Sequence, residues 1–238
     1  MTDSARLSAT TGAPSGPPGP SPCAGLAGSA PLAETARRLG RHAWLELRLF
    51  EVVGGWVGAE RDPAAKVAYS RWSAHHAWHG ELLRGLLPTV AELPAGELVA
   101  PAGREVAELA DALQAMDDPD HTVERLAACA RVVLPRLVSA ARAHLGRTSE
   151  IADQPVRRVL RLLLGDEEPD WHEAEALLQR VMVRDGDTGR AADAQRRLEA
   201  LAAAGPLDGG GRPGATATAA PTAATPRGPA RAEDDPRS

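Results

Sequence analysis

The chain has 238 residues, of which 43% are hydrophobic, 25% are charged and 3% are aromatic, and its formal net charge is −5. This balance excludes fibrous, disulfide-framework and fully disordered proteins, and the length allows one domain or at most two. Strand-rich folds rely on aromatic and β-branched residues, so the scarcity of aromatic residues beside many Ala and Leu residues predicts an all-α fold.

The two ends of the chain are rich in Gly, Pro, Ala, Thr and Ser. We expect residues 1–28 and 205–238 to be disordered, because such segments bury too little apolar surface to fold. The charges within each end cancel, so the negative charge belongs to the predicted helical domain, residues 29–204. An acidic domain between neutral tails argues against binding to a nucleic-acid backbone.

The sequence gives no sign of a membrane segment or a disulfide framework. It has no run of about 18 apolar residues, and its first residues lack the apolar core of a secretory signal. The only cysteines, Cys23 and Cys129, are far apart in the sequence. We therefore expect a cytoplasmic protein that does not contact membranes, and a homodimer stays open.

Helical patterns with clear start and stop signals fill the middle of the chain. The first predicted helix covers about residues 31–60. Asp62 and Pro63 then supply the N-cap and first position of a second helix, which ends near Leu87. A long connection follows over residues 89–116, and its last part, residues 104–116, has a weaker amphipathic pattern.

The second half of the domain repeats this organisation. A third helix is predicted to begin at Pro119 and to end near Gly146, and a fourth to cover about residues 154–183. A final helix over residues 188–203 is expected to pack on the outside. Two hairpins joined by one long crossover are typical of a ferritin-like four-helix bundle, whereas an up-down bundle needs only short loops.

Polar residues interrupt three of the four apolar stripes. Glu46 lies in the stripe of the first helix, His75 and His79 in that of the second, and Glu167 and Asp170 in that of the fourth. Counting outward from the two turns places all of them at the same depth. Buried carboxylates need partners, and a divalent metal ion satisfies imidazoles and carboxylates together.

This pattern resembles the ferritin-like dimetal-carboxylate proteins, which place Glu on the first and third helices and Glu-x-x-His on the second and fourth. Glu46, His75 and Glu167 match that pattern in type. Trp72 stands where the second-helix Glu is expected, and Asp170 stands where the fourth-helix His is expected.

The resemblance implies a degenerate centre, because Val133 stands at the level of the missing third-helix Glu. It implies one iron or manganese ion, with Asp170 as an additional ligand or a catalytic base. Such a centre activates dioxygen to oxidise, desaturate or hydroxylate a small or carrier-bound substrate, so an enzyme would be a metal-dependent oxidoreductase. The candidate ligands are Glu46, His75, His79, Glu167 and Asp170.

A metal-free interpretation stays open beside this one. Glu46 can hydrogen-bond to a histidine of the second helix, and the carboxylates of the fourth helix can pair with Arg131 or Arg136. The chain would then be a ferritin-like protein that binds or scaffolds a partner. An alternative register, His76-x-x-His79, makes His79 the histidine of the family pattern, although His76 is expected at the rim.

Two prolines and two further histidines complete the predictions. Pro135 and Pro169 lie inside the third and fourth helices, within about a turn of the polar layer, where each kinks its helix or breaks it into two. His42 and His144 are expected at the surface or at helix ends.

Overall fold

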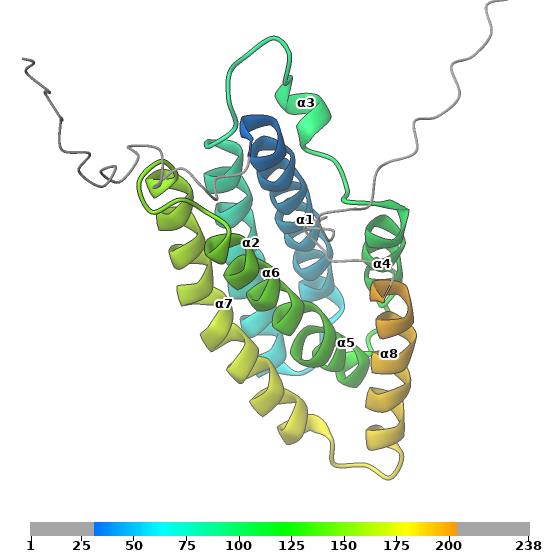
Figure 1. The fold of residues 1–238 in the computed structure, drawn as a ribbon. Coiled ribbons are helices and arrows are strands. Elements are labelled where there is room, and N and C mark those ends of the chain that lie inside the picture. Colours follow the sequence, from blue (N-terminus) through cyan, green and yellow to red (C-terminus); the bar gives the residue numbers. More distant parts are fainter. Residues whose placement is uncertain (1–30, 204–238) are drawn as a thin grey trace, which may run out of the picture.

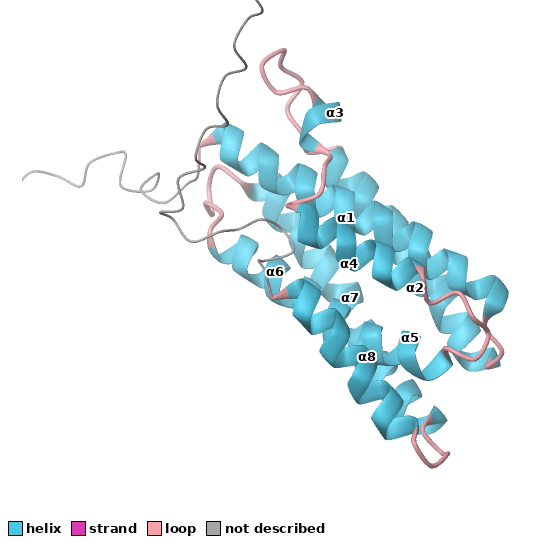
Figure 2. Ribbon diagram, turned by 90° about the vertical axis from the view of Figure 1, so that its right-hand side faces the viewer, coloured by secondary structure: helices cyan, strands magenta, loops and turns pink. Residues whose placement is uncertain are grey.

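The computed structural model describes residues 31–203, so the two ends predicted to be disordered lie outside the described residues. Within this range the all-α prediction is confirmed, and no strand is present (Figure 2). None of the described helices has the length and hydropathy needed to cross a bilayer. The elements are α1 (Leu32–Ala59), α2 (Pro63–Arg84), α3 (Ala95–Leu98), α4 (Arg104–Gln114), α5 (Thr122–Ala128), the π-helical turn η1 (Cys129–Val133), α6 (Leu134–Gly146), α7 (Gln154–Val181) and α8 (Asp187–Ala202).

Two helical hairpins make up most of the domain. Helices α1 and α2 form the first hairpin, while α5, η1 and α6 form one continuous rod that packs against α7. Figure 1 shows α6 and α7 in front of α1 and α2. The turn between α1 and α2 is capped as predicted, because Asp62 accepts a hydrogen bond from the backbone N–H of Ala65 at 2.8 Å and Pro63 follows it.

Neither internal proline breaks its helix. Pro135 has no N–H for the preceding helical turn, and its ring crowds the carbonyl group four residues earlier. The chain meets this constraint with the wider turn η1, which ends just before Pro135, and then continues as α6. Helix α7 runs unbroken through Pro169. Trp171 of α7 donates a hydrogen bond from Nε1 to the carbonyl oxygen of Ala130 at 2.7 Å, which ties α7 to the π-helical turn.

The third helix begins later than predicted. Asp118 and Pro119 belong to a turn, in which the backbone N–H of Asp120 donates to Asp118 Oδ1 at 2.8 Å and that of His121 donates to the Asp118 carbonyl oxygen at 3.0 Å. Helix α5 therefore starts at Thr122.

The last helix packs on the outside of the two hairpins, and its buried face adds to the hydrophobic core. Helix α8 packs on α4 and α5, as Figures 1 and 2 show, and it buries Ala191, Ala194 and Leu198. The amphipathic piece of the crossover, α4, also packs against α1. The long connection thus contributes packing of its own.

Polar side chains divide the core into two apolar clusters. The larger cluster includes Leu49, Tyr69, Trp72 and Leu178. The smaller includes Leu39, Leu83, Leu160 and Leu163. Along α2 and α7, buried histidines and carboxylates stand between the residues of the two clusters. This polar layer is the candidate functional site.

Candidate metal centre

Three helices supply the polar layer. Helix α1 contributes His42 and Glu46, which are four residues apart and so share a face, and α2 contributes His76 and His79, which are three apart. Helix α7 contributes Glu167. All five side chains lie in residues that are at most 3% exposed. Their polar atoms are therefore shielded from bulk water.

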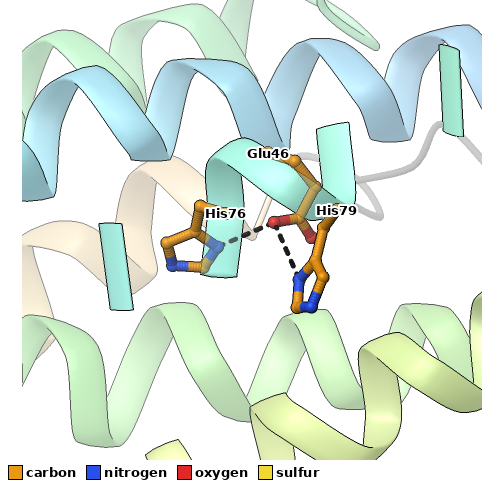
Figure 3. Close-up of side chains that lie close together, drawn as sticks. All are labelled: Glu46, His76 and His79. Atoms are coloured by element: carbon orange, nitrogen blue, oxygen red, sulfur yellow. Dashed lines mark hydrogen bonds and ion pairs between the residues drawn. The ribbon is translucent and has the colours of Figure 1, made fainter. Parts of the chain in front are cut away.

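The carboxylate of Glu46 lies at the centre of this group. Its Oε2 accepts a hydrogen bond from His76 Nδ1 at 2.7 Å and lies 3.6 Å from His79 Nδ1. Figure 3 shows the two imidazoles of α2 turned toward the same carboxylate oxygen. One ligand atom from each of Glu46, His76 and His79 lies within 4.8 Å of the other two, so a metal ion can reach all three.

His79 is held in a defined orientation by a carboxylate on its far side. Its Nε2 donates a hydrogen bond to Asp166 Oδ2 at 3.0 Å. With Nε2 bonded in this way, the other ring nitrogen, Nδ1, faces Glu46 and lies 4.0 Å from Glu167 Oε1. Nδ1 has no hydrogen-bond partner. A metal-binding histidine commonly has such a carboxylate on its second nitrogen, which fixes the tautomer and the ring orientation.

The two buried carboxyl groups have opposite pKa shifts. Burial alone raises the pKa of Glu46, but attraction to His76 and the polar contacts with His42, His76 and His79 outweigh it and hold the pKa well below its ordinary value. Burial, the negative charge of Glu46 and the nearby carboxylates together raise the pKa of Glu167 well above its ordinary value. The site thus favours an ionised Glu46 beside a protonated Glu167.

The pKa of His79 is also shifted. Burial lowers it, but the contacts with Glu46 and Asp166 act in the opposite direction, and the net shift is upward. The charged form of this imidazole is stabilised because carboxylates stand on both of its sides.

His75 and Asp170 form a separate pair closer to the surface. His75 Nδ1 lies 2.6 Å from Asp170 Oδ2, and Arg71 Nε lies 3.9 Å from Asp170 Oδ1. Burial raises the pKa of Asp170, against the opposing effects of His75 and Arg71. The predicted residues His75 and Asp170 are thus brought together, while His76 takes the place beside Glu46 that was expected for His75.

This pair lines a surface depression of about 320 Å³ next to the polar layer. Asp166 lies in the same depression and is the link to His79. Arg71 and Glu173 form an ion pair on its wall. The depression therefore connects solvent with the outer nitrogen of a buried imidazole.

Two further residues from the sequence analysis lie beside the layer rather than in it. Trp72 occupies the core and donates from Nε1 to Glu173 Oε2 at 3.1 Å. Arg131 pairs with Glu175 at 3.4 Å rather than with a carboxylate of the layer, and both carboxyl oxygens of Glu167 lack a hydrogen-bond partner. Arg131 is therefore not the partner of Glu167 or Asp170 that the metal-free interpretation expects.

Two buried histidines of the layer were not predicted as its main residues: His42 was not among the candidate ligands, and His76 was expected at the rim. His42 and His144 were expected at the surface or at helix ends. His144 does lie in the last turn of α6, but both residues are buried, at 1% and 2% exposed. The spacing of four residues between His42 and Glu46 was a readable signal, since it places both side chains on one face.

No family model, curated protein or solved structure matches this chain. Any functional assignment therefore depends on the geometry of the polar layer.

Proposed function

We propose that this protein is a metalloprotein that binds iron, or alternatively manganese, on Glu46, His76 and His79. The observation that carries this proposal is the convergence of one carboxylate and two imidazoles, all buried, from two helices of one hairpin. The unpartnered Nδ1 of His79, directed at Glu46 while its Nε2 is bonded to Asp166, supports the same conclusion.

The chemistry of the donor atoms favours these two metals. Two histidines and one carboxylate with open positions form the ligand set typical of non-haem Fe(II) oxygenases, and imidazole with carboxylate also suits manganese. The buried thiol Cys129 belongs to the π-helical turn and is not part of this trio. Structural zinc sites more often use thiolates and close all four positions.

The enzyme class we propose is an oxidase or hydroxylase of a small or carrier-bound substrate. An iron ion held in this way would activate dioxygen and would accept or donate single electrons. The depression beside His75 and Asp170 adjoins the layer at Asp166, and its volume of about 320 Å³ is in the range of small-molecule sites, so it is the proposed binding place of a polar substrate. Asp170 is then placed to hold or transfer a proton at the mouth.

The arrangement of the two hairpins supports a ferritin-like four-helix bundle as the scaffold. In such bundles the metal ligands project inward from facing helices at mid-length, as Glu46, His79 and Glu167 do here. The crossover between the hairpins then contains α3 and α4.

The proposed metal site is tested by thermal unfolding with and without Fe(II) under anaerobic conditions, and with and without Mn(II). A ligand at about 100 times its Kd stabilises the folded state by about 2.7 kcal/mol, which corresponds to roughly 5 to 10 °C for a chain of this size. We expect a metal-dependent rise in melting temperature for the wild type. His79→Leu should abolish it.

His75→Leu is the matched control, because His75 lies on the same helix but bonds to Asp170 instead of Glu46. It should keep the metal response of the wild type. A response that persists in His79→Leu and disappears in His75→Leu would contradict the assigned ligands. If the wild type does not respond to either metal, the metal-free scaffold becomes the better account.

A further inference from the structure

Three neighbouring residues of the polar layer carry buried polar atoms without hydrogen-bond partners. They are His42, Glu46 and Glu167, whose side chains are at most 1% exposed. The atoms concerned are His42 Nδ1, His42 Nε2, Glu46 Oε1, Glu167 Oε1 and Glu167 Oε2. Buried polar groups are nearly always paired, so five such atoms in one place require an explanation.

The two oxygens of Glu46 have different surroundings. Its Oε2 faces His76 and His79, at 2.7 Å and 3.6 Å. Its Oε1 lies 3.3 Å from His42 Nε2, but the two atoms are not aligned for a hydrogen bond. The carboxylate thus presents one oxygen to the histidines of α2 and the other to the histidine of its own helix.

A second trio of ligand atoms combines Glu46 with His42 and Glu167. One ligand atom from each of His42, Glu46 and Glu167 lies within 4.8 Å of the other two, which is the same criterion that Glu46, His76 and His79 meet. The two trios have only Glu46 in common. They therefore define two neighbouring positions.

Hydrogen bonding within this trio leaves most of its polar atoms unpaired. A neutral imidazole donates one hydrogen bond, whereas Glu46 and Glu167 together present three oxygens without a partner. A cation accepts lone pairs from all three side chains together.

We propose that the protein binds a second metal ion on His42, Glu46 and Glu167, so that Glu46 bridges two ions through its two oxygens. This inference rests on the proposed function, because the two positions share Glu46. One imidazole and two carboxylates form a mixed nitrogen and oxygen ligand set that suits Fe(II) or Mn(II). Pairs of ions held by shared ligands are a recurrent device of metalloenzymes.

The stoichiometry of metal binding tests this second position. The full-length protein, freed of metal and titrated with Mn(II), should bind two ions per chain by calorimetry and by elemental analysis after gel filtration. Its electron paramagnetic resonance spectrum should contain the signal of a spin-coupled pair. Neither readout depends on catalytic activity.

Two variants each remove a ligand that belongs to the second trio alone. His42→Leu deletes its imidazole, and Glu167→Gln keeps the shape of the side chain but removes the carboxylate. Each should bind one Mn(II) per chain and give the spectrum of an isolated ion. His172→Leu, which replaces an exposed histidine of α7 outside both trios, should still bind two.

The possible outcomes separate the two proposals. One ion in the wild type and one in both variants would overturn the second position and leave the proposed function intact. An ion count that falls to zero in His42→Leu, with folding confirmed by circular dichroism, would show a single site that needs His42 and would also overturn it. Two ions in all variants would place the second ion elsewhere. No bound ion in the wild type would overturn both proposals.

Discussion

The burial of Glu167 is unfavourable when the protein is free of metal. Both of its carboxyl oxygens lack a hydrogen-bond partner, and its residue is 1% exposed. Burial and the charge of Glu46 raise the pKa of Glu167 well above its ordinary value, so folding requires that it keep a proton which the unfolded chain releases. In the proposed site a metal ion would take the place of that proton, so metal affinity should increase with pH.

Glu167→Gln should stabilise the metal-free protein at pH 8. Because folding raises the pKa of Glu167, the contribution of this carboxyl group to stability is fully present below the pKa of the unfolded chain, 4.5. That contribution is lost as the pH rises through the pKa of the folded protein. Because one unit of pKa shift is worth about 1.4 kcal/mol, we expect a gain of at least about 1 kcal/mol in the free energy of unfolding in urea.

Glu168→Gln is the control for that change, since Glu168 is the next residue, is 38% exposed and pairs with Arg142. Its effect should stay within about 0.5 kcal/mol, as for most surface substitutions. A Glu167→Gln variant less stable than the wild type at pH 8 would show that the carboxyl group has a stabilising partner.

The identity of the histidine beside Glu46 shows where sequence reasoning reaches its limit. Successive helical residues differ by about 100° in direction, so a small error in register exchanges His75 for His76. The presence of Glu46, His79 and Glu167 at one depth followed from turn positions and helix length, and all three are buried together. The partners of His42 and His75 depend on how α7 is rotated, which no local pattern fixes.

At the scale of elements, the contact between α1 and the short helix α3 depends on a glycine. A Cβ on Gly40 would lie 2.2 Å from the carbonyl oxygen of Leu98, so the backbone of α3 approaches α1 more closely than any side chain allows. The crossover therefore packs closely against the N-terminal half of α1.

Gly40→Ala should therefore destabilise the protein, although Ala is the better helix former. We expect a loss of about 1 to 3 kcal/mol, the usual cost of overpacking, measured by urea denaturation. Metal stoichiometry should stay the same, since α3 does not contribute to either trio.

Gly58→Ala in the same helix is the matched control, because a Cβ there meets nothing within 4 Å. It should stabilise the protein by about 0.5 to 1 kcal/mol through helix propensity. Equal effects of the two substitutions would mean that α3 moves aside at no cost.

The helix boundaries were largely readable, and the exceptions have local causes. Asp62, Pro63 and Pro155 mark helix starts because their capping and backbone preferences are local. The same signal at Pro119 misled, since Asp118 forms a turn there and the helix starts three residues later. The burial of one face of α8 arises from packing between segments that are distant in the sequence.

At the scale of the whole molecule, buried histidines couple folding to pH. His144 of α6 is 2% exposed and its Nδ1 has no hydrogen-bond partner. Burial lowers its pKa to about 3, and the charges of His42, Arg38 and Arg147 act in the same direction. The contribution of His144 to stability is present above the unfolded value of 6.5 and is lost as the pH falls toward about 3.

His144→Leu should make the stability of the metal-free protein less sensitive to acid. Between pH 7 and pH 5 the wild type should lose about 2 kcal/mol through this group alone, because the unfolded imidazole is protonated and the folded one is not. Urea unfolding at the two pH values measures this difference. An equal loss in His144→Leu would show that His144 is not held neutral.

Anomalous X-ray diffraction tests most directly whether a metal ion binds in the polar layer between the two apolar clusters. Crystals grown with Mn(II) or, without oxygen, with Fe(II) should give an anomalous peak in contact with Glu46, His76 and His79. A second peak between His42 and Glu167 would accompany it if Glu46 bridges two ions. A map with no peak in the layer, or with its only peak at His75 and Asp170, would contradict the account.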